Sequence, residues 1–558
     1  MSANEETQPK RPNYFLWTAP LVGALATIAV VKPTLFTNTI TDVSKFFYMK
    51  FDWLIMWLPL LAFTVCMVVA LSPRFGNIRL GGKDAQPEYS FFSWMNMLFT
   101  AGIGVGIVFF GPIEALWHYY HSPIGIQAEN LPEYQKVENA MSLALHVWGI
   151  PAWSLYTIGG LVLAYFMYQH KTECTPSAPL EYAFKHKKWA KPLGILITGI
   201  AIVSIAMSVS SSIAMASTQI SSGMKIITGM DFSTIGWQTV VLIIIASLYT
   251  LGAVLPIEKG MKWLGDLTVV LSLLMLVFVF LVGPTHYFLS NLVVSIGNIL
   301  TQTVHHSFEL YLFHNRDWLV WYPMAYWVWW ITWTPFVGVF LAKISKGRTL
   351  REFVLASIMV PVGFLVIWFS VFSGFSLLDT VEGSGRLAEI ANKGDYEGTF
   401  YYLLNMLPLS FATKPLTVVL FLGFVVTTVT SSAISLGIMT SNDGRRENKT
   451  RAVVWAILMS LIAYAVIVTG KMEGIKAVGS FSGFPFVFIV LMVRRTLAPT
   501  QTRRTPHAIR PRTCKKQGVN RGKTNYVFES KCSRQHSRNC IDGFGSRLFM
   551  LCHQTGLH

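Results

Sequence analysis

Six tryptophans lie within the sixteen residues from Trp318 to Trp333, in the sequence WLVWYPMAYWVWWITW. The face of an indole ring attracts cations, and it suits in particular a cation that cannot donate hydrogen bonds, such as a quaternary ammonium. Tryptophan is also enriched where membrane helices meet the water interface. The run therefore has two interpretations: a site for an organic cation, or an aromatic belt at the membrane surface.

A second aromatic group contains Trp148, Trp153 and Tyr156. Trp153 and Tyr156 are about one helical turn apart and share a face. Trp148 is not quite on that face, which leaves two alternatives for it, a break in the helix or a place in the belt. The adjoining His146 is either a proton-coupling residue or a buried histidine with satisfied hydrogen bonds.

Three alternate glycines, Gly102, Gly104 and Gly106, interrupt the apolar segment 89–116. Glycine weakens a helix by about 1 kcal/mol relative to alanine. Broken helices at mid-membrane bind ions and substrates in secondary transporters, whereas close helix packing is the structural alternative. Glu114, near the outer end of this segment, is either a functional carboxylate or a helix-end acid that faces water.

Hydroxyl side chains are concentrated in two other apolar segments, in the sequences TTVTSSAIS (427–435) and SVSSSIAMAST (208–218). Oxygen atoms are the ligands that hard cations prefer. Hydroxyls in membrane helices also bond back to carbonyls of the preceding turn. The density of hydroxyls favours an ion site in 427–435, and the same two interpretations apply to 208–218.

These groups belong to a chain of 558 residues that is 53% hydrophobic and 13% charged. A soluble protein carries roughly twice that share of charged residues. Apolar stretches of about 20 residues, long enough to cross a bilayer core of about 30 Å, recur along the chain. The pattern predicts an all-α polytopic membrane protein with twelve transmembrane helices, near 14–31, 52–72, 89–116, 141–168, 192–222, 237–255, 265–288, 318–344, 352–378, 415–440, 452–470 and 473–493.

Loops between these segments alternate in charge. One set is basic, as in 74–83 and 343–351, and the other is mixed or acidic, as in 129–138 and 379–397. Because basic loops stay in the cytoplasm, both termini are expected there. The segment 290–313 is apolar but interrupted by polar residues, which predicts an amphipathic helix against the bundle or the interface.

Residues 494–558 differ from the rest, with fourteen Lys or Arg, two acids and no apolar period at helical spacing. A polybasic arm attracted to anionic lipid is one interpretation. The other, which we favour, is a disordered or an altered, for example frameshifted, C-terminus.

Three segments together resemble the betaine/choline/carnitine transporter family. WVWWITWTPFVGVFLAKISKGRTLREF (327–353) is similar to the family's tryptophan-rich eighth helix and its following loop. SWMNMLFTAGIGVGIVFFGPIEAL (93–116) resembles its third helix, and HVWGIPAWSLY (146–156) resembles its fourth. The resemblance covers about residues 14–493.

The resemblance implies two inverted five-helix repeats preceded by two extra helices, with substrate held at the repeat interface near mid-membrane. It also implies a bacterial cytoplasmic (inner) membrane location and assembly as a homotrimer. The expected divisions are a cytoplasmic tail (1–13), two extra helices and a loop (14–88), the first repeat (89–288), an amphipathic connecting helix (289–317), the second repeat (318–493) and the basic tail (494–558).

The resemblance further implies an aromatic box around a trimethylammonium group. By match of motif its members are Trp148, Trp153, Tyr156 and Trp330, with Trp333 in the adjoining position. The backbone of Gly102, Gly104 and Gly106 is similar to the stretch that approaches the substrate's carboxylate or hydroxyl end. In the tryptophan run, Trp327 and Trp329 are then expected to be packing or gate residues, and Trp318 and Trp321 keep the belt interpretation.

A sodium site is implied in the same way. Thr430 and Ser431 match the pair that binds sodium in sodium-coupled members of the family. Thr100 and Ile103 would offer carbonyl oxygens to the same ion, and Thr427 another oxygen. Thr268 occupies the place where sodium-independent carnitine antiporters carry an arginine, which argues against that subtype.

We therefore expect a secondary transporter, not an enzyme, that imports glycine betaine together with sodium by alternating access. Choline, carnitine and dimethylsulfoniopropionate are alternative substrates. Proton-coupled choline-type uptake and a cation channel are alternative functions. The expected partners are the solute, sodium or a proton, and membrane lipid, with neither an organic cofactor nor nucleic acid.

Overall fold

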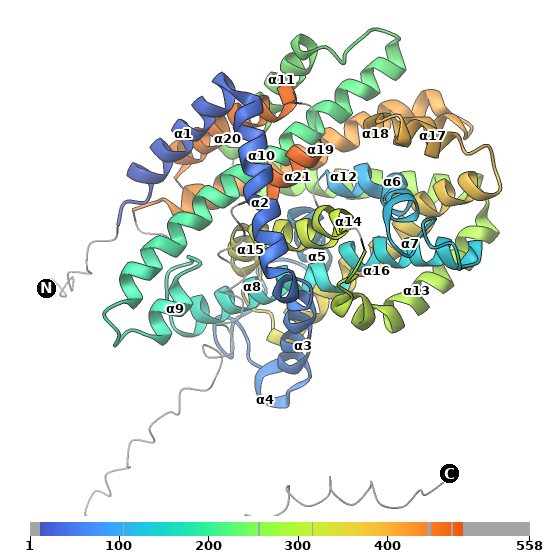
Figure 1. The fold of residues 1–558 in the computed structure, drawn as a ribbon. Coiled ribbons are helices and arrows are strands. Elements are labelled where there is room, and N and C mark those ends of the chain that lie inside the picture. The colour runs from blue at the N-terminus through green and yellow to red at the C-terminus, as the bar shows by residue number, and fades with distance from the viewer. Residues whose placement is uncertain are drawn as a thin grey trace, which may run out of the picture. The chain divides into compact units, whose positions relative to one another are not determined.

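The computed structural model describes residues 12–103, 105–254, 257–314, 316–442, 448–469, 472–481 and 483, with the backbone alone at 99–103, 257–262 and 472–473. All the elements in this part of the chain are helices (Figure 1). Together with the length and apolarity of these helices, this confirms the prediction of an all-α polytopic membrane protein. Most of the predicted twelfth span, the tail 494–558 and residues 1–11 lie outside the described residues.

Connections of different lengths join the helices. In chain order they are α1 (Phe15–Val31), α2 (Pro33–Ile55), α3 (Leu58–Leu71), α4 (Pro73–Gly76), α5 (Phe91–Ile103), α6 (Gly106–His121), α7 (Glu133–Trp148), α8 (Ile150–Gln169), α9 (Ala178–Ala183), α10 (Ala190–Thr228), α11 (Ile235–Val254), α12 (Ile257–Val282), α13 (Thr285–Phe308), α14 (Asp317–Leu319), the π-helical turn η1 (Val320–Met324), α15 (Ala325–Ile344), α16 (Leu350–Val381), α17 (Arg386–Asn392), α18 (Tyr396–Asn405), α19 (Ser410–Met439), α20 (Lys449–Thr469) and α21 (Met472–Ser480).

Within the described ranges, eight helical segments are long and apolar enough to cross a membrane, or nine if α1 and α2 count as one bent span. The helices α7 and α8 together form one of these segments, and α14, η1 and α15 form another. The count of twelve spans and the inverted repeat both stay predictions.

The N-terminal part differs from the predicted boundaries. The expected span at 52–72 begins later, at Leu58 in α3, and the preceding residues belong to α2, whose axis makes an angle of 116° with that of α1. Proline occupies the first turn of both α2 and α3, where its fixed φ favours helix initiation. Hydropathy alone missed α2 because this helix carries charged residues such as Lys45 and Lys50.

The helices α8 and α15 form the most extensive helix pair of the fold. Small residues allow this close approach, because a Cβ on Gly338 would lie 3.1 Å from the backbone nitrogen of Gly160, and one on Gly159 only 2.1 Å from Cγ2 of Thr334. Small side chains let membrane helices pack closely. The pairing brings together the two aromatic segments, which are more than 150 residues apart in the sequence.

Two helix breaks shape the centre of the fold. The helix α5 ends at Ile103 and α6 begins at Gly106. The helix α7 ends at Trp148, and Gly149, with φ −88° and ψ −136°, separates it from α8. Of the two alternatives for Trp148, the structure has the helix break.

Candidate functional site

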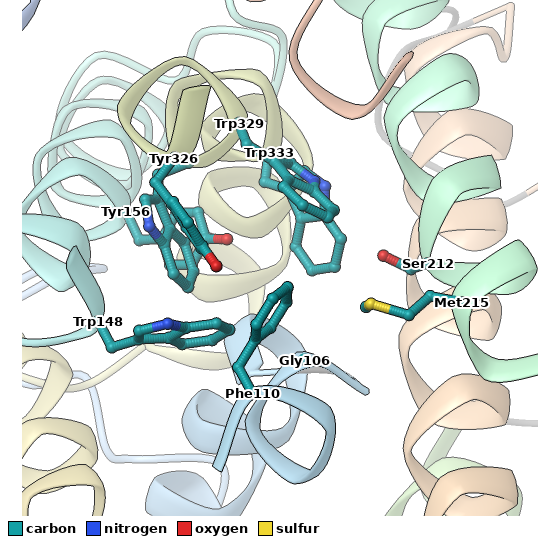
Figure 2. A pocket seen from close by; sticks show the side chains of 10 residues that line it. Gly106, Phe110, Trp148, Tyr156, Ser212, Met215, Tyr326, Trp329 and Trp333 are labelled. Atoms are coloured by element: carbon teal, nitrogen blue, oxygen red, sulfur yellow. The ribbon is translucent and has the colours of Figure 1, made fainter. Parts of the chain in front are cut away.

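A cavity of about 30 Å³ lies where α6, α7, α8, α10 and α15 meet (Figure 2). Its lining is dominated by aromatic side chains from four of these helices. The lining residues are Gly106, Phe110, Trp148, Tyr156, Ser212, Met215, Tyr326, Trp329, Trp330 and Trp333.

Trp148 lies at the centre of the aromatic rings that line the cavity. Its ring stands edge to face with that of Trp330, with 5.3 Å between centroids and 87° between planes. The rings of Phe110 and Tyr326 lie 5.4 and 5.8 Å from it. Because the helix break at Gly149 redirects the chain directly after Trp148, this ring reaches the same space as side chains of α8.

Tyr156 completes the contact between α8 and α15. Its ring centroid lies 5.1 Å from that of Trp330. The indole nitrogen of Trp330 donates a hydrogen bond to the carbonyl oxygen of Val147 (3.0 Å). This bond fixes the indole plane and connects α15 to the end of α7, so three of the four predicted box residues face one cavity.

Trp153, the fourth predicted box residue, is not among the cavity-lining residues. Its ring packs edge to face against Tyr156, with centroids 5.7 Å apart. Trp153 therefore contacts the box residue Tyr156 without lining the cavity itself. Trp333 lies at the cavity, as its adjoining position suggested, and its indole nitrogen donates to Oγ of Ser208 (2.7 Å) in α10.

Five lining residues were not predicted, namely Phe110, Tyr326, Trp329, Ser212 and Met215. Phe110 is four residues after Gly106 and therefore on the same helix face, which was a usable signal. Ser212 and Met215 belong to the hydroxyl-rich run 208–218, and they face the aromatic rings from across the cavity (Figure 2).

The roles of the tryptophans between Trp318 and Trp333 differ in part from those expected from the sequence. Trp329 lines the cavity, although it was expected to be a packing or gate residue. Trp327 packs edge to face on His146 (5.2 Å between ring centroids), as a packing residue does. The belt interpretation is wrong for Trp318, because its side chain is buried and stacked beside Tyr322.

The glycine segment reaches the cavity at Gly106. A Cβ at this position would lie 2.7 Å from Cη2 of Trp148. Only glycine therefore lets the ring of Trp148 cover the start of α6 without displacement. Gly102 lies in the last turn of α5, where the backbone alone is described, and Gly104 lies outside the described residues.

The predicted sodium residues occupy α5 and α19, which are in contact. In α19, Thr430 donates a hydrogen bond to the carbonyl oxygen of Tyr249 (3.3 Å) and Ser431 donates to that of Thr428 (2.8 Å). Thr427 donates within its own helix and, together with Thr430, lines a second cavity of about 340 Å³ formed by α11, α12 and α19.

Ser431 is not among the residues that line this second cavity. For the predicted ligands in α5, Thr100 and Ile103, the structure gives the backbone only. Whether the five predicted ligands converge on one ion stays a prediction.

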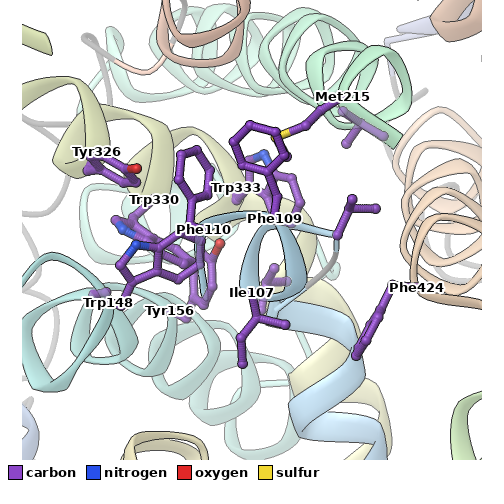
Figure 3. Close-up of a cluster of buried hydrophobic side chains, with 14 of the residues drawn as sticks. Ile107, Phe109, Phe110, Trp148, Tyr156, Met215, Tyr326, Trp330, Trp333 and Phe424 are labelled. Carbon is purple, nitrogen blue, oxygen red and sulfur yellow. The ribbon is translucent and has the colours of Figure 1, made fainter. Parts of the chain in front are cut away.

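All the residues that line the aromatic cavity are buried, except the half-buried Trp329. Ile107, Phe109 and Phe424 are buried and belong to the same cluster of hydrophobic side chains as the box residues (Figure 3). In such a desolvated setting, a cation over an aromatic face is stabilised by about 2 kcal/mol per contact. The aromatic faces offer a compact organic cation non-covalent partners only.

The chain matches one protein family, described as BCCT, betaine/carnitine/choline family transporter, over residues 13–504. It is 30% identical to a glycine betaine transporter of Acinetobacter baylyi over 483 residues, which cover 86% of this chain and 72% of that protein. It is 28% identical to an ectoine/hydroxyectoine transporter of Virgibacillus pantothenticus (86% and 94% covered). An osmo-dependent choline transporter of A. baylyi is 29% identical (88% and 71% covered).

These similarities extend over the whole membrane part and include the segments that form the aromatic cavity. They agree with the resemblance carried by the three sequence segments. The chain belongs to the betaine/carnitine/choline transporter family, and it is a membrane transporter rather than an enzyme.

Proposed function

We propose that this transporter imports glycine betaine by alternating access, with sodium as the coupling ion. The observation that carries the proposal is the meeting of Trp148, Tyr156 and Trp330 around one buried cavity. Trimethylammonium groups cannot donate hydrogen bonds, so aromatic faces are the partners that replace their hydration.

The size of the cavity bears on the transport cycle. A cavity needs about 10–15 Å³ to hold one water molecule. The aromatic cavity, with about 30 Å³, therefore has room for roughly two water molecules. A trimethylammonium group is larger. Entry of the solute therefore requires the lining side chains to move apart, and a site that opens and contracts is what alternating access needs.

Sodium coupling is supported by Thr430 and Ser431 in α19 and by the helix break that follows Ile103 in the neighbouring α5. One sodium ion moving inward across about 100 mV supplies roughly 2.3 kcal/mol, before its concentration gradient is counted. The proposed assembly is a homotrimer in the bacterial cytoplasmic membrane, in contact with lipid and with both termini in the cytoplasm.

The test is uptake into proteoliposomes of radiolabelled glycine betaine, choline, carnitine, ectoine and dimethylsulfoniopropionate, each with and without an inward sodium gradient. Saturable betaine uptake that collapses without sodium is the expected result. Uptake that follows an imposed proton gradient at constant sodium would show that the coupling ion is a proton rather than sodium. Flux that is linear in solute concentration and needs no ion gradient would indicate a channel.

A further inference from the structure

Two ionisable side chains are buried next to the aromatic cavity without lining it. Glu114, in α6, has an exposed fraction of 0%, so the alternative of a water-facing acid is wrong. Lys476, in α21, is 4% exposed. Ionisable groups in the interior of a membrane protein are costly to bury and therefore mark function by default.

Both side chains contact one wall residue of the cavity, Tyr326. The phenol oxygen of Tyr326 donates a hydrogen bond to Oε2 of Glu114 (2.7 Å). The ammonium nitrogen of Lys476 lies 4.9 Å from the centroid of the Tyr326 ring. A single aromatic ring thus connects an acidic side chain and a basic side chain, and that ring borders the cavity (Figure 2).

Several contacts hold Lys476 in place. Its ammonium lies 3.9 Å from the ring centroid of Tyr322 and 5.9 Å from that of Phe110, which also lines the cavity. It donates a hydrogen bond to the carbonyl oxygen of Trp321 (3.1 Å). Aromatic faces stabilise a desolvated ammonium, so these contacts offset part of the cost of burying this side chain.

The position of Glu114 is equally constrained. Its Oε1 atom lies 3.1 Å from Nε2 of His118, one turn further along α6. Figure 3 places Tyr326 beside Phe110 and Trp148, whose ring centroids lie 5.7 and 5.8 Å from that of Tyr326. The carboxyl group is therefore one ring away from the box that would receive the solute's cation.

From this geometry we infer that Lys476 is a specificity-determining residue, which selects zwitterionic solutes with a carboxylate over solutes that carry only a positive charge. The inference rests on the proposed function, since it assumes that the box binds the ammonium group. Coulomb interactions are strong in a low-dielectric interior. Glu114 is close to the ammonium group that choline and glycine betaine share, so it does not distinguish the two solutes. The charge of Lys476 repels that shared ammonium group and attracts the carboxylate that only glycine betaine carries.

The structural alternative is that Lys476 only packs between Tyr322 and the carbonyl of Trp321. The two roles differ in one measurable quantity, the ratio of the KM values for betaine and choline. A lost packing contact changes both KM values in the same direction, whereas a lost charge changes them in opposite directions. Arg at position 476 keeps the charge, and Met keeps the approximate length of the side chain without it.

The experiment measures uptake of glycine betaine and choline by the wild type, Lys476→Met and Lys476→Arg in proteoliposomes. We expect Lys476→Met to raise the ratio of betaine KM to choline KM at least tenfold, and Lys476→Arg to restore most of the wild-type ratio. Lys393→Met, at the exposed C-cap of α17, is the control and should leave the ratio unchanged. An unchanged ratio in Lys476→Met would overturn the inference.

A second arm uses the wild type and does not depend on the folding of any variant. Glycine betaine methyl ester keeps the trimethylammonium group but has lost the negative charge. We expect the ester to compete with labelled betaine at least tenfold more weakly than unlabelled betaine does. Equal competition by the ester and by unlabelled betaine in the wild type would contradict the inference. If the wild type transports neither betaine nor choline, the proposed function fails instead.

Discussion

The indole rings of Trp148 and Trp330 meet edge to face, with 5.3 Å between their centroids and 87° between their planes. This is the geometry in which the positive edge of one aromatic ring meets the negative face of the other. Trp148 ends α7 and Trp330 lies in the second turn of α15, 182 positions further along the sequence. From this contact we predict how substitutions of the surrounding residues change transport.

The first prediction concerns the relative importance of the aromatic residues. Trp330→Ala should raise the KM for betaine at least tenfold, because it removes a cavity face worth about 2 kcal/mol to a desolvated cation. Trp153→Ala should have a smaller effect, because Trp153 touches Tyr156 and does not line the cavity. Radiotracer uptake normalised to the amount of inserted protein measures both. An equal loss of betaine uptake in the two variants would show that Trp330, which lines the cavity, and Trp153, which does not, have the same importance.

A second prediction uses the close approach of α6 to Trp148. Gly106→Ala places a Cβ 2.7 Å from Cη2 of Trp148, and overpacking of this kind costs about 1–3 kcal/mol. Betaine uptake should therefore fall about 5- to 160-fold, since each 1.4 kcal/mol corresponds to a factor of ten. Gly363→Ala, in α16, is the matched control because its Cβ would meet nothing within 4 Å. Normal uptake by Gly106→Ala would show that Trp148 can shift without loss of the site.

A third prediction tests the sodium site with two neighbouring serines. Ser431 and Ser432 both donate hydrogen bonds to the carbonyl oxygen of Thr428 (2.8 and 2.7 Å). Only Ser431 belongs to the pair proposed to bind sodium. Ser431→Ala should raise the sodium concentration for half-maximal uptake about tenfold, equivalent to about 1.4 kcal/mol, and Ser432→Ala should not. Similar sodium curves for both variants would speak against this site.

A fourth prediction concerns pH. His306, in α13, contacts Oγ of Ser142 through Nε2 (2.9 Å). Burial lowers the pKa of His306 to about 4, with further lowering by His305 and His118. The unfolded value is about 6.5, so between these values the unfolded chain binds more protons than the folded protein. Stability should therefore fall as the pH drops, by about 2 kcal/mol between pH 7 and pH 5.

Thermal unfolding in detergent at pH 7 and pH 5 measures this effect. His306→Gln should remove a large part of the pH dependence. His286→Gln, at an exposed position of the same helix, should keep it. Parallel curves for the wild type and His306→Gln would show that other groups cause the acid sensitivity.

Much of the fold could be predicted because the length of an apolar stretch can be read directly from the local sequence. The span predicted at 318–344 corresponds to the segment Asp317–Ile344, and the one at 415–440 to Ser410–Met439. The helix Pro33–Ile55 was missed because its charges break the apolar signal. Its sharp bend relative to α1 arises at Lys32 and Pro33, whose local conformation hydropathy does not report.

The site was predicted less completely than the fold. Trp148, Tyr156, Trp330 and Trp333 were identified through motifs, and all four line the cavity. Tyr326 was not identified, because nothing in its local sequence distinguishes an aromatic residue of the cavity wall from one in the core. Its contact with Glu114 joins positions 212 residues apart.

By itself, the sequence determined the membrane-spanning character of this protein and which segments carry aromatic rings, glycines and hydroxyls, because these are properties of composition along the chain. Only the tertiary structure decided which of those rings share a cavity. The breaks at Gly149 and before Gly106, and the close packing of α8 against α15, set the direction of each ring. Such directions depend on contacts between distant segments, which the spacing of residues along one helix does not contain.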